Sequence, residues 1–195
     1  CYTIFTEFKK LGDYHMKNLL VAQSGGPTSA INATLAGVVE NALSSPSVDK
    51  IYGSINGIQG VLTENLVDLK AKITNVSELD LLCQTPASAL GSCRVKLKDP
   101  AVCADEYETI ISVLRKYNID CFIYIGGNDS MDTVSKLPRY AETVNSEIRF
   151  IGIPKTIDND LWGTDMTFGF QSAVDVATRA IDCIHTTAAS HGRVF

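Results

Sequence analysis

The sequence predicts an α/β fold in which helices cover both faces of a doubly wound, mainly parallel sheet. Short apolar stretches typical of buried strands alternate with longer stretches whose apolar residues recur at helical spacing. Parallel strands require crossover connections, and helices usually supply them. Three apolar stretches are followed directly by segments rich in glycine or aspartate, which read SGGPTSA, GGNDSM and PKTIDND. Because ligands bind beyond the carboxyl ends of such strands, we expect these segments to converge there.

The first predicted strand covers residues 17–23 (KNLLVAQ), and SGGPTSA follows it. Apolar residues at helical spacing predict a helix from about Ser29 to Leu43. A second strand is expected at about residues 50–54, before the glycine-punctuated stretch NGIQG.

A further helix is predicted from Asp99-Pro100 to about Tyr117, because aspartate is a good N-cap and proline suits the first helical turn. Its apolar side is expected to carry Val102, Ile110, Val113 and Leu114. A buried strand over residues 119–125 leads through GGNDSM into a helix expected from Asp129 to Leu137.

The last predicted strand runs from Ile148 to Ile153 and ends at Pro154. The stretch PKTIDNDLWGTD is expected to form a long polar loop. Four apolar residues at helical spacing predict a helix from Phe170 to about Ser190: Ala173, Ala177, Ile181 and Ile184.

Composition limits the classes of partner. With 195 residues, 45% of them hydrophobic, the chain can build a sizeable core. A net charge of −5 without a basic cluster argues against nucleic-acid and anionic-membrane surfaces and favours a small-molecule partner. The sequence has no apolar run of the roughly 18 to 20 residues that span a membrane, and it does not open with the apolar core of a secretion signal. We therefore expect a cytoplasmic protein.

The cysteines are expected to be free thiols. The six, at positions 1, 83, 93, 103, 121 and 183, form no C-x-x-C motif and have no histidine at metal-ligand spacing. A disulfide framework is improbable in a chain of this length without a secretion signal.

The segment GGNDSM favours an anion site. Gly126 and Gly127 let the backbone turn tightly and approach a ligand, and a helix beginning beyond them offers unpaired N–H groups to a phosphate. The alternative is an ordinary strand-to-helix turn in which Asn128, Asp129 and Ser130 serve only as caps. The sequence matches neither G-x-x-x-x-G-K-[ST] nor G-x-G-x-x-G, so these two phosphate motifs are excluded.

The segment PKTIDND combines a cation, a hydroxyl and two acids: Lys155, Thr156, Asp158 and Asp160. Phosphoryl transfer requires positive charge on the moving group and a carboxylate that accepts the proton of the attacking hydroxyl. Lys155 could supply the first and Asp158 the second. The alternative is an aspartate-rich solvated loop.

Six segments resemble, in order, the signature segments of the 6-phosphofructokinases: SGGPTSAINA, GSCR, GGNDS, PKTIDND, GTDMTFGF and TTAASHGR. The resemblance implies that residues 17–169 form a phosphoryl-donor-binding domain. Residues 170–195 would form only the start of a sugar-phosphate-binding domain, so the second domain is expected to be truncated and the chain alone inactive. Residues 1–16 are expected to be an extension outside the resemblance.

The implied reaction is phosphoryl transfer to the 1-hydroxyl of fructose 6-phosphate, a step of glycolysis that uses Mg²⁺. Asp158 matches the family's catalytic base, and Thr156 and Asp160 match residues that line the sugar and metal site. Gly25, which precedes Gly26 in the first loop, matches a glycine whose amide faces the donor phosphate.

Two arginines also match the family. Arg94, in GSCR, matches an arginine near the transferring group, although isolated arginines are often only solvated. Arg193, in SHGR, matches the arginine that reaches the sugar 6-phosphate of a neighbouring subunit. The resemblance therefore implies a homo-oligomer whose active sites are shared between subunits.

The predicted donor is pyrophosphate. ATP-dependent members commonly have GGDGS and PGTIDND, whereas pyrophosphate-dependent members commonly have aspartate at the position of Asp129 and lysine at that of Lys155. A carboxylate in place of glycine crowds and repels the α-phosphate of a nucleotide, and a lysine neutralises compact pyrophosphate. Some ATP-using members also carry the lysine, so Asp129 is the more decisive residue.

Asn128 departs from the family pattern, because many members have an aspartate there close to the magnesium. An amide is a weaker ligand than a carboxylate for this hard cation. The metal is expected at Asp129 or Asp160, or chelated to pyrophosphate and held through water.

Three alternatives remain. The first is an ATP-dependent 6-phosphofructokinase. The second is a kinase of the diacylglycerol or NAD type, which has a GGDG turn but gives no reason for PKTIDND. The third is a non-catalytic subunit that binds sugar phosphate, which would be expected to lack Asp158 or Thr156; both are present.

Overall fold

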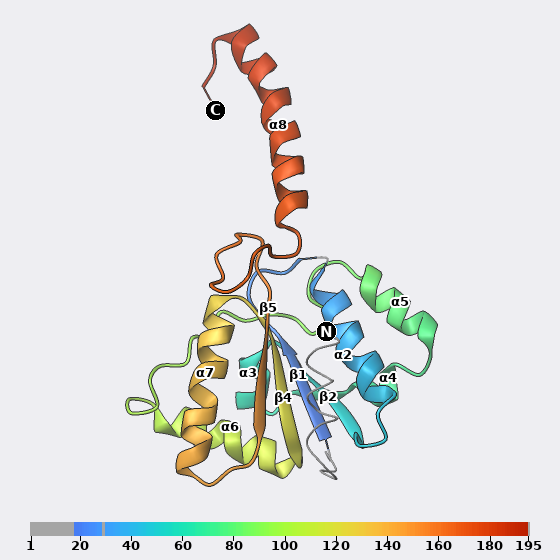
Figure 1. Cartoon of the computed structure of the whole chain (residues 1–195), viewed down its shortest axis with the longest axis vertical. Helices are drawn as coiled ribbons and strands as arrows, with labels where there is room; N and C mark the ends of the chain where they lie inside the picture. The colour runs from blue at the N-terminus through green and yellow to red at the C-terminus, as the bar shows by residue number, and fades with distance from the viewer. Residues whose placement is uncertain (1–17, 29, 195) are drawn as a thin grey trace. The chain divides into compact units, whose positions relative to one another are not determined.

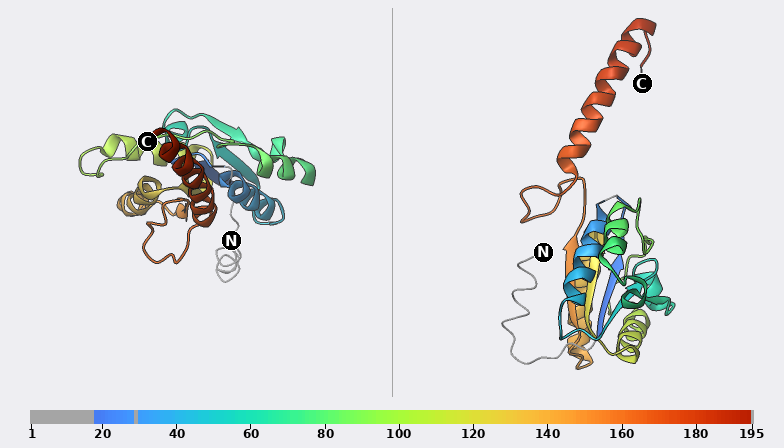
Figure 2. Two further views of the ribbon diagram at one scale, coloured as in Figure 1. Left: turned by 90° about the horizontal axis from the view of Figure 1, so that it is seen from above. Right: turned by 90° about the vertical axis from the view of Figure 1, so that its right-hand side faces the viewer.

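The computed structural model describes residues 18–28 and 30–194. They divide into two compact units at the peptide bond between Pro154 and Lys155. The first unit contains a five-stranded sheet with helices on both faces (Figure 1 and Figure 2). The second contains a loop and one long helix, α8 (Phe170–His191). The predicted functional boundary at residues 169 and 170 stays a prediction.

The sheet is mainly parallel, as predicted. Its strands are β1 (Asn18–Gln23), β2 (Lys50–Ser54), β3 (Leu66–Asp68), β4 (Ile119–Gly126) and β5 (Arg149–Pro154). They lie in the order β3-β2-β1-β4-β5, with β3 antiparallel to β2 and the other pairs parallel. Gln23 lies opposite Ile125, and Gly126 lies opposite Pro154. The carboxyl ends of β1, β4 and β5 are therefore level.

Helices cover both faces of this sheet, which confirms the doubly wound class. On one face lie α2 (Ile31–Leu43), α4 (Leu69–Lys72) and α5 (Val76–Gln84). On the other lie α3 (Ile58–Leu62), α6 (Ala104–Lys116) and α7 (Asn128–Thr143). Successive residues of β1 contribute to opposite cores, Leu19 to the first and Leu20 to the second. Burial of both faces explains why the middle of β1, from Leu19 to Ala22, is a continuous apolar run.

The predicted start of the helix at Asp99 is wrong. The Asp99 carboxylate accepts a hydrogen bond from the Ala101 N–H at 2.9 Å, and the Asp99 carbonyl accepts from Val102 and Cys103. This local turn satisfies the backbone before α6 begins at Ala104. Val102 consequently lies outside the helix and is exposed, whereas Ile110, Val113 and Leu114 are buried as predicted.

Other boundaries differ by smaller amounts. The predicted strand residue Lys17 and helix start Ser29 lie outside the described residues, and α2 begins at Ile31. Helix α7 extends to Thr143 rather than Leu137, with buried Leu137 and Ala141 on its inner side. Helix α8 agrees with its predicted range, but none of its described residues is buried.

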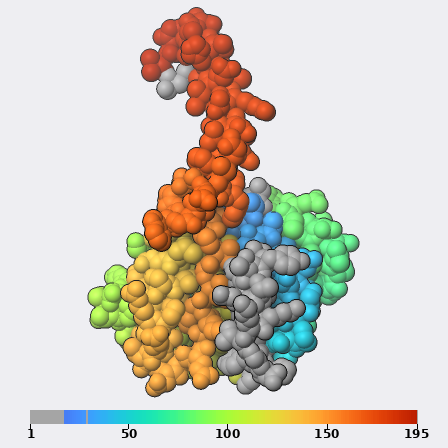
Figure 3. Space-filling view, in the orientation of Figure 1, coloured from blue at the N-terminus to red at the C-terminus, as the bar shows by residue number. Residues whose placement is uncertain are grey.

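The structure adds four short elements to the predicted set: β3, α3, α4 and α5. The outer sides of α5 and α7 form part of the molecular surface in Figure 3. The five described cysteines are free, as predicted. Of the described helices, none combines the length and apolar character that crossing a membrane requires.

Candidate functional site

The loop after β1 makes a sharp turn. The Ser24 N–H donates to the Ile125 carbonyl at 2.8 Å, which continues the pairing of β1 with β4 for one residue. Gly25 then takes a φ of +79°, a left-handed conformation that favours glycine. Gly26, the second glycine of the predicted donor loop, is exposed.

The GSCR segment lies against this loop. The Ser92 hydroxyl donates to the Gly25 carbonyl at 2.5 Å, and the Ser24 hydroxyl donates to the Cys93 carbonyl at 3.0 Å. These bonds join parts of the chain 67 and 69 residues apart. The structure thus brings Arg94, which follows Cys93 and is exposed, to the predicted donor loop.

Two buried amides hold this connection in place, and the sequence analysis did not identify them. The Gln23 side-chain oxygen accepts from the Ser88 hydroxyl and from the Leu90 N–H, both at 2.9 Å. The Asn32 side chain accepts from the Ala89 N–H at 2.9 Å and donates to the carbonyls of Thr85 and Ala87 at 2.8 Å. The amides also bond to each other, at 3.0 Å. Buried polar groups need such partners, so the network fixes the backbone that leads to GSCR.

The GGNDS turn packs directly on the first loop. A Cβ at Gly126 would lie 2.2 Å from the Ser130 hydroxyl and 3.1 Å from the Ser24 carbonyl, so only glycine fits between them. Gly127 is the N-cap of α7, and its carbonyl accepts from the Ser130 N–H at 3.0 Å. Ser130 is buried. The N-cap of α7 makes no side-chain hydrogen bond, so the side chains of Asn128, Asp129 and Ser130 do not cap the helix as the alternative interpretation expected.

Asn128 begins α7, one residue before the predicted start, and Asp129 lies in its first turn. The 16-residue helix directs its first N–H groups toward the edge where the loops after β1 and β4 meet. That edge is a suitable place for an anion.

A lysine that the sequence analysis missed pairs with Asp129. The Lys96 ammonium lies 3.1 Å from the Asp129 carboxylate, and both side chains are largely exposed. This hydrogen bond raises the pKa of Lys96. Burial alternates from Arg94 to Leu97, with Arg94 and Lys96 exposed and Leu97 buried. The charged–apolar alternation in RVKLK was the signal that could have identified Lys96 as outward-facing.

In PKTIDND, Pro154 ends β5 in the first unit, and the residues from Lys155 onward belong to the second unit. Lys155 and Thr156 are buried, whereas Asp158 and Asp160 are exposed. Burial lowers the pKa of Lys155, and the Asp158 carboxylate partly opposes that shift. The Thr156 hydroxyl accepts from the Asp158 N–H at 3.0 Å, which forms a local turn.

Asn159 closes the same loop. It has a φ of +55°, and its side-chain oxygen accepts from the Thr167 N–H at 2.8 Å. The carboxylates of Asp158 and Asp160, on either side of this anchor, are exposed and so accessible to a ligand. Arg193 follows α8 and is also exposed, and its N–H donates to the Ala188 carbonyl in the helix cap.

Comparison with protein-family models matches residues 18–195 to the phosphofructokinase model. The chain belongs to the phosphofructokinase family. This confirms the resemblance read from the six sequence segments, and the fold class agrees with it.

The chain is similar to phosphofructokinases of both donor classes. It is 44% identical over 170 residues to the pyrophosphate–fructose 6-phosphate 1-phosphotransferase of Xanthomonas campestris, covering 85% of this chain and 40% of that protein. It is 37% identical over 177 residues to the ATP-dependent 6-phosphofructokinase 3 of Bacteroides thetaiotaomicron, covering 89% of this chain and 49% of that protein. The chain therefore spans less than half the length of these relatives.

A solved structure with the same fold is the pyrophosphate-dependent phosphofructokinase of Nitrosospira multiformis. It has a TM-score of 0.75 and 37% identity, with 90% of this chain and 44% of that chain covered. The corresponding enzyme of Marinobacter aquaeolei gives a TM-score of 0.70 and 42% identity, covering 80% of this chain and 37% of that one.

The residues that could hold the family's Mg²⁺ form no dedicated cage. Across residues 18–28 and 30–194, no group of three or more His, Cys, Asp or Glu side chains is placed to bind a metal ion. The predicted ligand Asp129 is paired with Lys96. Mg²⁺ commonly binds through one or two carboxylates together with substrate phosphates and water. The exposed carboxylates of Asp129 and Asp160 are side chains that fit such a role.

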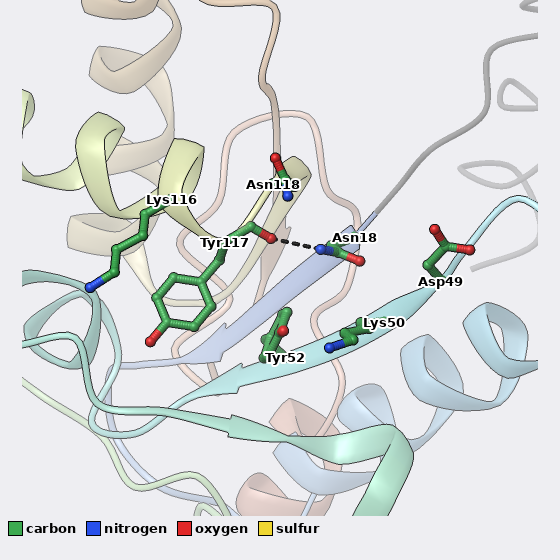
Figure 4. Close-up of a pocket in the computed structure, with 7 residues that line it drawn as sticks. All are labelled: Asn18, Asp49, Lys50, Tyr52, Lys116, Tyr117 and Asn118. Carbon is green, nitrogen blue, oxygen red and sulfur yellow. Dashed lines mark hydrogen bonds between the residues drawn. The ribbon is translucent and has the colours of Figure 1, made fainter.

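The opposite edge of the sheet carries a pocket of about 310 Å³ at the amino ends of the strands. Figure 4 shows its lining residues, including Asn18, Lys50 and Tyr117. The Asn18 side chain donates to the Tyr117 carbonyl at 2.6 Å, and Lys116 at its rim pairs with Glu64. Ligands of doubly wound sheets bind at the carboxyl ends of the strands, so this pocket lies apart from the candidate site.

Proposed function

We propose that the full-length protein transfers a phosphoryl group from pyrophosphate to the 1-hydroxyl of fructose 6-phosphate, giving fructose 1,6-bisphosphate and phosphate. The observation that carries the choice of donor is the Asp129 carboxylate in the first turn of α7. Asp129 adds negative charge and bulk where a glycine would let a nucleotide approach the backbone. The relatives named as pyrophosphate-dependent, at 39 to 44% identity, support the same choice.

The donor would be held mainly by backbone and cationic groups. The turn at Gly25 and Gly26 and the backbone from Gly127 to Asp129 at the start of α7 are suited to phosphate oxygens, whereas the Ser130 N–H is already bonded to the Gly127 carbonyl. Lys155 adds a cation whose low solvation strengthens its attraction for an anion. Mg²⁺, when bound with pyrophosphate, neutralises negative charge on the donor.

The acceptor would be activated by a carboxylate. We assign to Asp158 the removal of the proton from the sugar 1-hydroxyl as that oxygen attacks phosphorus. Its backbone N–H is held by the Thr156 hydroxyl, which restricts the local turn. Asp160 is assigned to the sugar and metal site, and Arg94 to the charge of the transferring group.

The last substrate contact is assigned across a subunit boundary. Arg193 would bind the sugar 6-phosphate of a neighbouring subunit, so the protein is proposed to act as a homo-oligomer. Arginine suits this task because its planar guanidinium can bind a phosphate through two hydrogen bonds.

The second candidate is an ATP-dependent 6-phosphofructokinase, favoured by relatives of that name at 35 to 37% identity.

The test is to incubate the full-length protein with fructose 6-phosphate and Mg²⁺, and with either pyrophosphate or ATP. Fructose 1,6-bisphosphate formed with pyrophosphate supports the proposal. Product formed with ATP alone favours the second candidate, and no product with either donor supports a non-catalytic subunit.

A further inference from the structure

The Lys96–Asp129 pair joins two segments that border the candidate donor site. Lys96 lies two residues beyond Arg94, and Asp129 lies in the first turn of α7. Their charged groups are 3.1 Å apart, within the range of a charge-assisted hydrogen bond. The pair therefore links GSCR to GGNDS next to the loop after β1.

The backbone on both sides of Lys96 is fixed. On one side, the Ser24 hydroxyl holds the Cys93 carbonyl. On the other, Leu97 is buried, and its carbonyl accepts from the Lys136 ammonium at 3.1 Å. Lys96 consequently projects from an anchored segment.

The Asp129 carboxylate has fewer restraints. About two thirds of its side chain is exposed (68%), and Lys96 is the ion-pair partner that the described structure gives it. An exposed ion pair contributes little to folding stability, because solvent screens it. Its consequence is local, because the ion pair selects one direction for a carboxylate that could otherwise rotate into solvent.

We propose that Lys96 is a positioning residue for donor selectivity, holding the Asp129 carboxylate between the GSCR segment and the start of α7. The inference rests on the proposed function, since it concerns how the assigned donor site rejects nucleotides. Pyrophosphate is compact, whereas ATP carries an α-phosphate and a nucleoside that need additional room beside the start of α7, where Asp129 lies. Rejection of ATP by Asp129 therefore depends on Lys96.

This role differs from a direct contact between Lys96 and phosphate. Loss of a phosphate-binding cation weakens both donors, and that shared effect cancels in their ratio. Loss of a positioning residue changes the ratio of the affinities for the two donors. It does so only if residue 129 still carries a carboxylate.

The experiment uses the full-length protein and its Lys96→Gln, Asp129→Asn and double variants. Lys96→Arg keeps the charge, and Lys98→Gln is the matched control, because Lys98 is an exposed lysine two residues away on the same segment. For each protein we would measure KM and kcat for pyrophosphate with Mg²⁺. The inhibition constant of AMP-PNP, a non-transferable ATP analogue, against pyrophosphate reports nucleotide binding without requiring turnover.

The preference for pyrophosphate is the AMP-PNP inhibition constant divided by the pyrophosphate KM. Lys96→Gln should lower it by about 3- to 10-fold, the scale of one exposed charge-assisted contact. It should stay within about twofold of the parent in Lys96→Arg and Lys98→Gln. In the Asp129→Asn background, Lys96→Gln should cause no further change.

The inference would be overturned if Lys96→Gln left the preference for pyrophosphate unchanged or increased it. It would also be overturned if Lys96→Gln lowered this preference as much in the Asp129→Asn protein as in the parent. If the parent uses pyrophosphate and either of these results is found, only the proposed role of Lys96 is refuted. A parent that forms no product with either donor, or uses ATP alone, removes the proposed donor and this inference with it. Circular dichroism spectra and Tm values matching the parent show that the variants are folded.

Discussion

Gly126→Ala should damage both stability and catalysis, because the two loops around Gly126 leave no room for a methyl group. The added Cβ would lie 2.2 Å from the Ser130 hydroxyl oxygen, 2.7 Å from the Ser130 Cβ and 3.1 Å from the Ser24 carbonyl. Rotation of the Ser130 hydroxyl relieves the first contact but not the second. The first turn of α7 must therefore shift relative to the loop after β1.

The expected cost is about 1 to 3 kcal/mol of unfolding free energy, the usual range for overpacking a well-packed interior. The assay is urea unfolding of the full-length protein, read as a lower midpoint at constant slope. A shifted α7 also displaces the proposed phosphate-binding N–H groups, so kcat/KM for pyrophosphate should fall as well.

Gly37→Ala is the matched control. Gly37 lies inside α2, and a Cβ there would meet nothing within 4 Å. This substitution should raise the unfolding free energy by about 0.5 to 1 kcal/mol, since glycine is unfavourable inside a helix. Adding Ser130→Gly to Gly126→Ala should recover part of the loss. A Gly126→Ala protein with the parent's midpoint and activity would refute the packing argument.

Two further predictions concern the second unit. Asp158→Ala should lower kcat by roughly 10²- to 10⁴-fold, with a much smaller change in the KM for fructose 6-phosphate, because a general base acts in the transition state; a kcat within about threefold of the parent would remove this role. Burial lowers the pKa of Lys155, so its charge should be lost as pH rises through a value below the usual ~10.4. The kcat/KM for pyrophosphate should fall over that same pH range, and Lys155→Arg should remove this alkaline decline, because arginine stays charged; persistence of the decline in that variant would assign it to another group.

The main strands were predictable because their signal is local and long enough to recognise. All residues of β1 are buried, and seven of the eight in β4 are buried, so the apolar runs LLVA in β1 and CFIYI in β4 are easily recognised in the sequence. The meeting of SGGPTSA and GGNDSM follows from parallel strands that end at one level.

The short elements were not predictable in the same way. Strand β3 has three residues and α4 has four, which is too few to show a period. Asp99 misled the prediction because the same side chain can close a turn instead of capping a helix.

The residues that position the candidate site depend on distant partners. Gln23 bonds to Ser88 across 65 residues, and Asn32 bonds to Ala89 across 57 residues. No local pattern relates such positions. The roles of Thr156, Arg94 and Arg193 follow from the family resemblance, and the role of Asp158 follows both from its place in PKTIDND and from that resemblance; all four are proposals.

The central claim is that Asp129 makes the full-length protein select pyrophosphate over ATP. The most direct measurement is kcat/KM for both donors, with fructose 6-phosphate saturating, in the parent and in Asp129→Gly. The account predicts that the parent favours pyrophosphate and that Asp129→Gly admits ATP and lowers the preference, because glycine removes both the charge and the bulk. A parent that favours ATP, or an Asp129→Gly protein with an unchanged donor ratio, would contradict it.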